Sequence, residues 1–135
     1  MIALAAILLA AAAASALDEA AASLAAQTAA WNGGDLEAAL AFYCDRPDMT
    51  WVARRGVTHG YRAFAEGMRK DFADRSRMGV MRFQLLDARP IADGKALTTM
   101  KWEITSGGKR LMGDVSTQLW QPCGGRLRVV LEHAS

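Results

Sequence analysis

The chain has 135 residues, of which 52% are hydrophobic and 22% are charged. This length favours a single domain, and this composition suits a packed core and excludes a disordered tail. The formal net charge of +2 is too small to indicate nucleic-acid binding, and no basic stripe interleaved with aromatic residues supports it. The basic residues gathered between positions 54 and 89 are interpreted as solvated surface, or alternatively as a rim that attracts anions.

The first sixteen residues carry no charged side chain and end in Ala14-Ser15-Ala16, an A-x-A cleavage pattern. We predict a signal peptide over residues 1–16, a single domain over 17–135, and a periplasmic or secreted mature protein. The alternatives are an uncleaved anchor, and a start assigned too far upstream, in which case the protein is cytoplasmic. The apolar stretch is shorter than the about 20 residues of a membrane span, so no stable span is expected after cleavage.

Helical periodicity dominates the first half of the chain. Residues 17–31 place apolar side chains on one helical face, and Asn32-Gly33-Gly34 supplies the stop. Asp35 is predicted to cap a short second helix with an apolar face from Leu36 to Tyr43. The expected elements that follow are a strand at 49–53, a turn at 54–56, a strand at 57–59, a helix from Gly60 to Phe72 and a polar loop at 73–77.

The last third of the chain has the alternating pattern of strands. The predicted strands cover residues 79–89, 95–105, 110–121 and 126–134. Asp93-Gly94, Gly107-Gly108 and Gly124-Gly125 supply the turns between them. The predicted fold class is α+β, with three N-terminal helices packed on a curved, mostly antiparallel sheet made of the short early hairpin and a four-stranded C-terminal meander.

Three stretches resemble the SnoaL-like, nuclear-transport-factor-2-like (NTF2-like) superfamily, and more narrowly a bacterial branch of SnoaL-like domains. They are AWNGGDLEAALAFYCDRPDMTWV at 30–52, GVTHGYRAF at 56–64 and LRVVLEHAS at 127–135. The resemblance covers residues 18–135 and implies a cone-shaped fold, a pocket at its open end, and a homodimer formed through the outer sheet face. It transfers no activity, because the superfamily includes isomerases, dehydratases, cyclases, binding proteins and transport factors.

On such a fold, side chains from several elements can line one apolar pocket, the usual form of a small-molecule site. The candidates are Tyr43, Trp51, Phe64, Met68 and Trp102. Tyr43 and Trp51 are preferred because each has a polar group that needs a partner when buried. The alternative for all five is ordinary core packing.

His133 is the candidate catalytic residue. By strand parity it shares a face with Leu127, Val129 and Leu131. These apolar neighbours predict that His133 faces inward and lines the pocket as a general base or ligand donor. Glu132 would then point to the opposite face, so a partner carboxylate would come from Asp114 or Asp48. The alternative is a buried histidine satisfied by a backbone carbonyl or a carboxylate.

The strand at 110–121 has two distinct faces. Leu111, Val115 and Leu119 are expected to face the core. Met112, Ser116, Gln118 and Trp120, with Asp114, form the other face. We predict that this second face forms the dimer interface, because interface cores keep methionine and aromatic residues among polar groups. The alternatives are a plain solvent face and an active site.

Cys44 and Cys123 are far apart in sequence and form no C-x-x-C motif. Two free thiols are favoured over a disulfide, although an oxidising compartment would permit one. Two histidines without helical pairing do not predict a metal site. No cofactor is expected, because no phosphate-binding or dinucleotide-binding glycine pattern is present.

The sequence therefore predicts an exported domain that binds a small apolar or amphipathic molecule, with no assigned catalytic activity. One alternative is a lyase, isomerase or cyclase that uses His133 with a carboxylate for proton transfer. The other is an accessory dimerisation or interaction domain whose pocket is filled by its own side chains. The identity of the ligand does not follow from the sequence.

Overall fold

The computed structural model describes residues 2–91 and 94–135. Its elements are the helices α1 (Ile2–Asn32), α2 (Leu36–Leu40) and α3 (Tyr61–Asp71), the 3-10 turn η1 (Arg75–Arg77), and the strands β1 (Thr50–Ala53), β2 (Gly56–His59), β3 (Val80–Ile91), β4 (Lys95–Ser106), β5 (Lys109–Cys123) and β6 (Arg126–Ala134). The predicted elements agree with these bounds to within a few residues, apart from α2 and the N-terminal extension of α1. The predicted Asp93-Gly94 turn lies partly outside the described residues.

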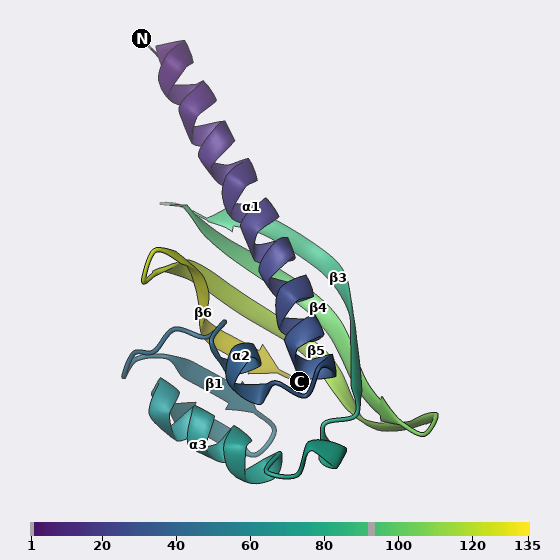
Figure 1. Cartoon of the computed structure of the whole chain (residues 1–135). Helices are drawn as coiled ribbons and strands as arrows, with labels where there is room; N and C mark the ends of the chain where they lie inside the picture. The colour runs from purple at the N-terminus through teal and green to yellow at the C-terminus, as the bar shows by residue number, and fades with distance from the viewer. Residues whose placement is uncertain (1, 92–93) are drawn as a thin grey trace.

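The six strands form one sheet in the order β2-β1-β6-β5-β4-β3 (Figure 1). β3 to β6 form an antiparallel meander, and β1 and β2 form a hairpin. The hairpin joins the meander through a parallel pairing of β1 with β6, in which Thr50 lies opposite Leu131. The α+β class and the mostly antiparallel sheet are therefore confirmed, and β6 is the strand that unites the two parts.

Helix α1 crosses one face of the sheet, and its N-terminal part extends beyond the sheet edge (Figure 1). Ala16, Ala20 and Leu24 recur every four residues along the helix and are buried in the main core. Leu4 and Ile7, in contrast, are 67% and 64% exposed. The helix runs without a break through the predicted cleavage point, and Ala16 at that point is buried. No helix among the described residues is long and apolar enough to cross a membrane.

The corner between α1 and α2 has the predicted chemistry. Gly34 has a φ of +72°, a left-handed conformation that glycine adopts without steric cost. The Asp35 carboxylate then accepts a hydrogen bond from the backbone N–H of Ala38 at 3.0 Å and caps α2. These two residues reverse the chain within one turn.

Trp31 and Asn32 attach this corner to the segment that leads into β3. The Trp31 indole N–H donates to the carbonyl of Met78 at 2.8 Å, and its ring meets Phe72 edge-on at 4.8 Å. The Asn32 amide donates to the carbonyl of Met81 and accepts from its N–H, at 2.9 and 2.7 Å. The tryptophan at the helix end therefore anchors α1 on the sheet.

Helix α2 ends at Leu40 rather than at Tyr43, where the sequence placed its last apolar contact. The chain turns instead into an extended segment beside β6, in which Tyr43 forms a parallel bridge with Val129. The backbone N–H of Cys44 donates to the carbonyl of Val129 at 2.8 Å, and the Val129 N–H donates to Phe42 at 2.9 Å. Pairing with β6 replaces the helical turn and fixes the Tyr43 side chain over the sheet.

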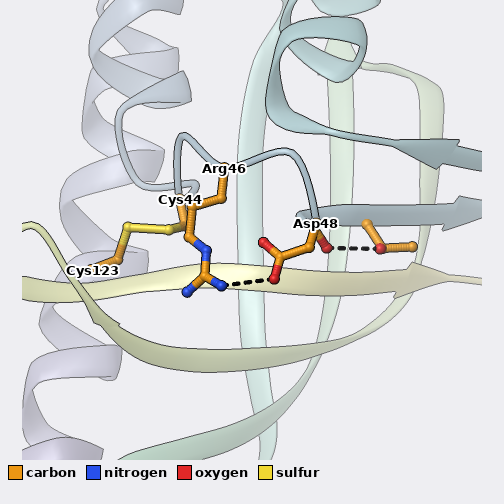
Figure 2. A network of polar contacts seen from close by, with 5 residues as sticks. Cys44, Arg46, Asp48 and Cys123 are labelled. Atoms are coloured by element: carbon orange, nitrogen blue, oxygen red, sulfur yellow. Dashed lines mark hydrogen bonds and ion pairs between the residues drawn. A yellow bond between two sulfur atoms is a disulfide. The ribbon is translucent and has the colours of Figure 1, made fainter.

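A disulfide joins Cys44 to Cys123, with their Cα atoms 6.0 Å apart (Figure 2). The prediction of two free thiols is therefore wrong. The residues are separated by 79 positions in sequence, but Cys44 follows the segment paired with β6 and Cys123 ends β5, the antiparallel neighbour of β6. Arg46 and Asp48 form an exposed ion pair in the same loop (Figure 2), a type of contact that contributes little to stability.

Candidate functional site

A cavity of about 890 Å³ lies between the three helices and the inner face of the sheet. A volume of this size lies within the range of small-molecule sites, which is roughly 300–1,000 Å³. The structure brings five of the six predicted pocket residues into its wall, namely Tyr43, Trp51, Phe64, Met68 and Trp102, whereas His133 is not part of it. The five come from four different segments of the chain, because Phe64 and Met68 both lie on α3. Ligand binding at this cavity stays a prediction.

Three aromatic rings form one part of the wall. The Phe64 ring lies 4.7 Å from the Tyr43 ring and 5.0 Å from the Trp51 ring, measured between centroids. Phe64 and Trp51 are close to parallel, at 29°. Phe64 is buried and Trp51 is partly exposed, so the cluster reaches from the core to the accessible part of the cavity.

The orientation of the end of β6 is opposite to the prediction. Leu119 pairs with Leu131, but the next residue, Trp120, pairs with Val129. Val130 is therefore the extra residue of a β-bulge, and the alternation of faces changes at this point. Glu132 is 2% exposed and lines the cavity. His133 is exposed on the opposite face of the sheet, so its predicted inward orientation is wrong.

Glu132 accepts three hydrogen bonds from neutral side chains. Its Oε1 accepts from the Tyr43 hydroxyl at 2.9 Å and from the Gln118 amide at 2.6 Å. Its Oε2 accepts from the Ser116 hydroxyl at 3.0 Å. Among the described residues, none of the ion pairs includes Glu132. The structure thus holds a buried carboxylate by hydrogen bonding without a matching cation.

Two indole groups fix the direction of these bonds. An indole N–H can only donate, and Trp102 donates to the Ser116 hydroxyl at 2.9 Å. Ser116 is then free to donate its own proton to Glu132. Trp120 donates in the same way to Thr98 at 2.9 Å. Two series of hydrogen bonds therefore lead to Glu132, one that begins at the partly buried Trp102 and one that begins at the buried Trp120.

The second of these series continues through Gln118. The Thr98 hydroxyl donates to the Gln118 amide oxygen at 3.2 Å, which turns the amide nitrogen toward Glu132. Each group in the network has a partner, and among the described residues no buried side-chain nitrogen or oxygen lacks one. A satisfied network of this kind holds its members in one arrangement.

The predicted dimer interface on β5 is therefore wrong for three of its four residues. Ser116, Gln118 and Trp120 are 0% exposed and point to the inner face, while Met112 is 39% exposed at the cavity edge. The polar row was assigned outward because serine and glutamine are uncommon in cores. Their burial is explained by Glu132, which their side chains hydrogen-bond directly.

Burial raises the pKa of the Glu132 carboxyl, and the three donated hydrogen bonds oppose this rise. The pKa of Tyr43 is raised well above its ordinary value, first by burial and then by the negative charge of Glu132. Tyr43 therefore stays protonated and remains a donor to Glu132 at neutral pH. In contrast, the ion pair with Arg69 lowers the pKa of the exposed Glu37.

These opposite shifts predict opposite effects of pH on stability. Because folding raises the pKa of Glu132, this residue makes its full contribution to the unfolding free energy below its pKa in the unfolded chain, about 4.3. That contribution is lost as the pH rises through the pKa of Glu132 in the folded protein. The unfolding free energy of the wild type minus that of Glu132→Gln should therefore fall with increasing pH. For Glu37→Gln the same difference should rise. Urea unfolding between pH 4 and 7 measures both, and a rise for Glu132→Gln would contradict the assignment.

The charged residues of the cavity are arranged by depth. Glu132 is buried and Asp114 is partly buried, whereas Arg54, Arg55, Arg77 and one acid, Asp71, are exposed at the edge. Part of the basic segment noted in the sequence therefore lies at the rim of the cavity. Within residues 2–91 and 94–135, no group of three or more His, Cys, Asp or Glu side chains is placed to hold a metal ion.

Comparison with solved structures shows the NTF2-like fold. An NTF2-like protein of unknown function from Shewanella oneidensis superposes with a TM-score of 0.82 and 20% identity, over 87% of this chain and 97% of that chain. One from Pseudomonas putida gives 0.68 and 20%, over 90% and 87%. A provisionally assigned dehydratase of the NTF2-like family from Streptomyces avermitilis gives 0.65 and 18%, over 88% and 94%.

Comparison with protein-family models gives no match, and comparison with curated proteins gives none. The predicted NTF2-like fold is thus confirmed. Identities of 20% or less carry the fold alone, because one fold supports many unrelated functions. The functional argument therefore depends on the residues of the cavity.

Proposed function

We propose that this protein is an exported domain that binds a small, mostly apolar molecule in the cavity between its helices and sheet. The observation that carries the proposal is the cavity itself, about 890 Å³ in volume, with aromatic and methionine side chains in its wall and one buried carboxylate. Apolar walls with a few fixed polar groups are typical of ligand sites. The accessory-domain alternative required a cavity filled by the protein's own side chains, so the volume favours binding.

Binding is favoured over proton-transfer catalysis for two reasons. His133, the residue on which the enzyme alternative depended, lies on the other face of the sheet. Glu132 already accepts three hydrogen bonds, which occupy three of the about four acceptor positions of its carboxylate. We therefore propose recognition, rather than chemistry, as the role of Glu132.

Export is supported by the disulfide between Cys44 and Cys123. Disulfides persist in oxidising compartments such as the periplasm and are rare in the cytosol. Removal of the predicted signal peptide is also compatible with the exposure of Leu4, Ile7 and Leu8, which are at least 64% exposed.

A homodimer remains part of the proposal, now through the outer sheet face. Val115 and Leu131 are 38% and 36% exposed on that face. Exposed apolar side chains on a sheet are candidates for contact with a second copy. In this proposal, outward-facing residues of β5 and β6 form the dimer interface in place of Ser116, Gln118 and Trp120.

Binding is tested with N-phenyl-1-naphthylamine, a neutral apolar dye that fluoresces in apolar surroundings. We expect saturable fluorescence enhancement with the wild type and its loss in Gly67→Trp, which adds a large side chain to the cavity wall on α3. Lys70→Trp, on the same helix but outside the cavity lining, should behave as the wild type. Equal binding by the two variants, or no binding at all, would refute the cavity as a ligand site.

The protein for this experiment is taken from a periplasmic extract, which tests the rest of the proposal on the same sample. Export predicts an N-terminus after residue 16, and native mass spectrometry should report a dimer. Retention of Met1 would refute cleavage, and a monomeric mass would refute the dimer.

A further inference from the structure

We propose that the cavity selects an organic cation: an ammonium group on an apolar body, with the ammonium group beside Glu132. The inference rests on the proposed binding function and specifies the chemistry of the ligand. It is carried by the position of one buried carboxylate, by its neutral partners, and by the aromatic rings around it.

Among the described residues, Glu132 is the only buried charged side chain. A carboxylate offers about four acceptor positions, of which Tyr43, Gln118 and Ser116 occupy three. All three donors are neutral, so they leave the charge uncompensated. A ligand ammonium group would supply both a fourth donor and the missing positive charge, and charge-assisted hydrogen bonds of this kind are the strong ones.

The aromatic wall suits the same group. Tyr43 contributes both a donor to Glu132 and a ring in the cavity wall, with Phe64 and Trp51 packed beside it at 4.7 and 6.4 Å. Aromatic faces attract ammonium groups through the negative charge on the ring face. Met68 and Met100 line the remaining inner wall and suit an alkyl body, because methionine adapts to irregular apolar shapes.

The arginines at the rim do not reverse this selectivity. Arg54, Arg55 and Arg77 are exposed, and solvent ions screen such charges over about 8 Å at physiological ionic strength. Glu132 is buried, where the lower dielectric strengthens its interactions. Asp114, partly buried in the same cavity, adds a second negative charge inside. The interior therefore favours a cation although the edge is basic.

The test uses three probes that share the same eight-carbon chain and differ in their head group: octylammonium, 1-octanol and octanoate. Each is used to displace N-phenyl-1-naphthylamine from the wild type. We expect octylammonium to displace the dye at a concentration at least about tenfold below that of 1-octanol, the effect of one charge-assisted hydrogen bond. Octanoate should be the weakest competitor. If octylammonium is no better than 1-octanol, or octanoate is best, the inference is overturned while the proposed function stands.

Glu132→Gln and Glu66→Gln provide a matched pair of charge removals. Glu132→Gln should lose most of the preference for octylammonium over 1-octanol, whereas Glu66→Gln, at an exposed position on α3 outside the cavity lining, should keep the preference. Retention of the preference in a folded Glu132→Gln variant would overturn the role of Glu132. The comparison of probes on the wild type decides the inference even if this variant does not fold. If neither the dye nor 1-octanol binds the wild type, the proposed function itself fails.

Discussion

Replacement of Trp120 by alanine is expected to lower the unfolding free energy by about 3–5 kcal/mol, the usual loss when a large aromatic side chain is removed from a core. Trp120 is 0% exposed and belongs to the main core, together with Leu24 of α1 and Val129 of β6. Its indole N–H also donates to Thr98, the first hydroxyl in the chain of donors to Glu132. Guanidinium unfolding followed by circular dichroism measures the loss independently of tryptophan fluorescence.

Leu119→Ala is the matched control for this experiment. Leu119 precedes Trp120 on β5 but faces the other side of the sheet and is partly exposed. Its truncation should cost about 1 kcal/mol, as for an average substitution outside the core. If Trp120→Ala instead leaves the stability intact and separates a dimer, the inner orientation of this row is wrong and the interface predicted from the sequence is restored.

Removal of the disulfide should have an effect of similar size. A double Cys44→Ala, Cys123→Ala variant is expected to lose about 2–5 kcal/mol of unfolding free energy, because the cross-link restricts a long loop of the unfolded chain. The two residues are 79 positions apart, and Cys44 is 0% exposed. Urea unfolding of the variant and of the oxidised wild type measures the difference.

Reduction separates the cross-link from the substitutions. The wild type unfolded in the presence of a reducing agent should lose about as much stability as the double variant, whose own stability should not respond to the agent. A reduced wild type as stable as the oxidised protein would show that the disulfide contributes nothing to folding. The disulfide holds Cys44, the residue that follows Tyr43 of the cavity wall, so dye binding should also weaken on reduction.

Local signals predicted most of the fold. These signals are the corner from Trp31 to Asp35, the glycine turns and the alternation of apolar and polar residues, and each is read from residues that are close in sequence. The structure has helices and strands where these signals predict them. Helix α2 was predicted too long because its apolar spacing continues to Tyr43, whereas pairing with Val129 decides the backbone there. The disulfide was not predictable, since the two cysteines meet only after β5 and β6 have paired.

The site depends on features that alternation alone does not carry. Counting alternate residues along β6 assigns Glu132 outward and His133 inward, and the single extra residue Val130 reverses both. The face of β5 that carries Ser116 and Gln118 is predicted wrongly for a different reason, since these polar residues are typical of a face exposed to solvent. The burial of Glu132 explains their inward orientation, because a carboxylate inside the core requires polar neighbours on the adjacent strand.

The position of β6 constrains the order in which the chain can fold. Among the described residues, the β1–β2 hairpin pairs with the meander only through β6, so the sheet is complete only when Thr50 has paired with Leu131. Pairings between such distant residues slow folding, because closing the long intervening loop costs entropy before the contact forms. Most of the polypeptide must therefore be synthesised before its sheet can close. The disulfide between Cys44 and Cys123 then ties the segment beside β6 to the end of β5, so it restrains the part of the sheet that closes last.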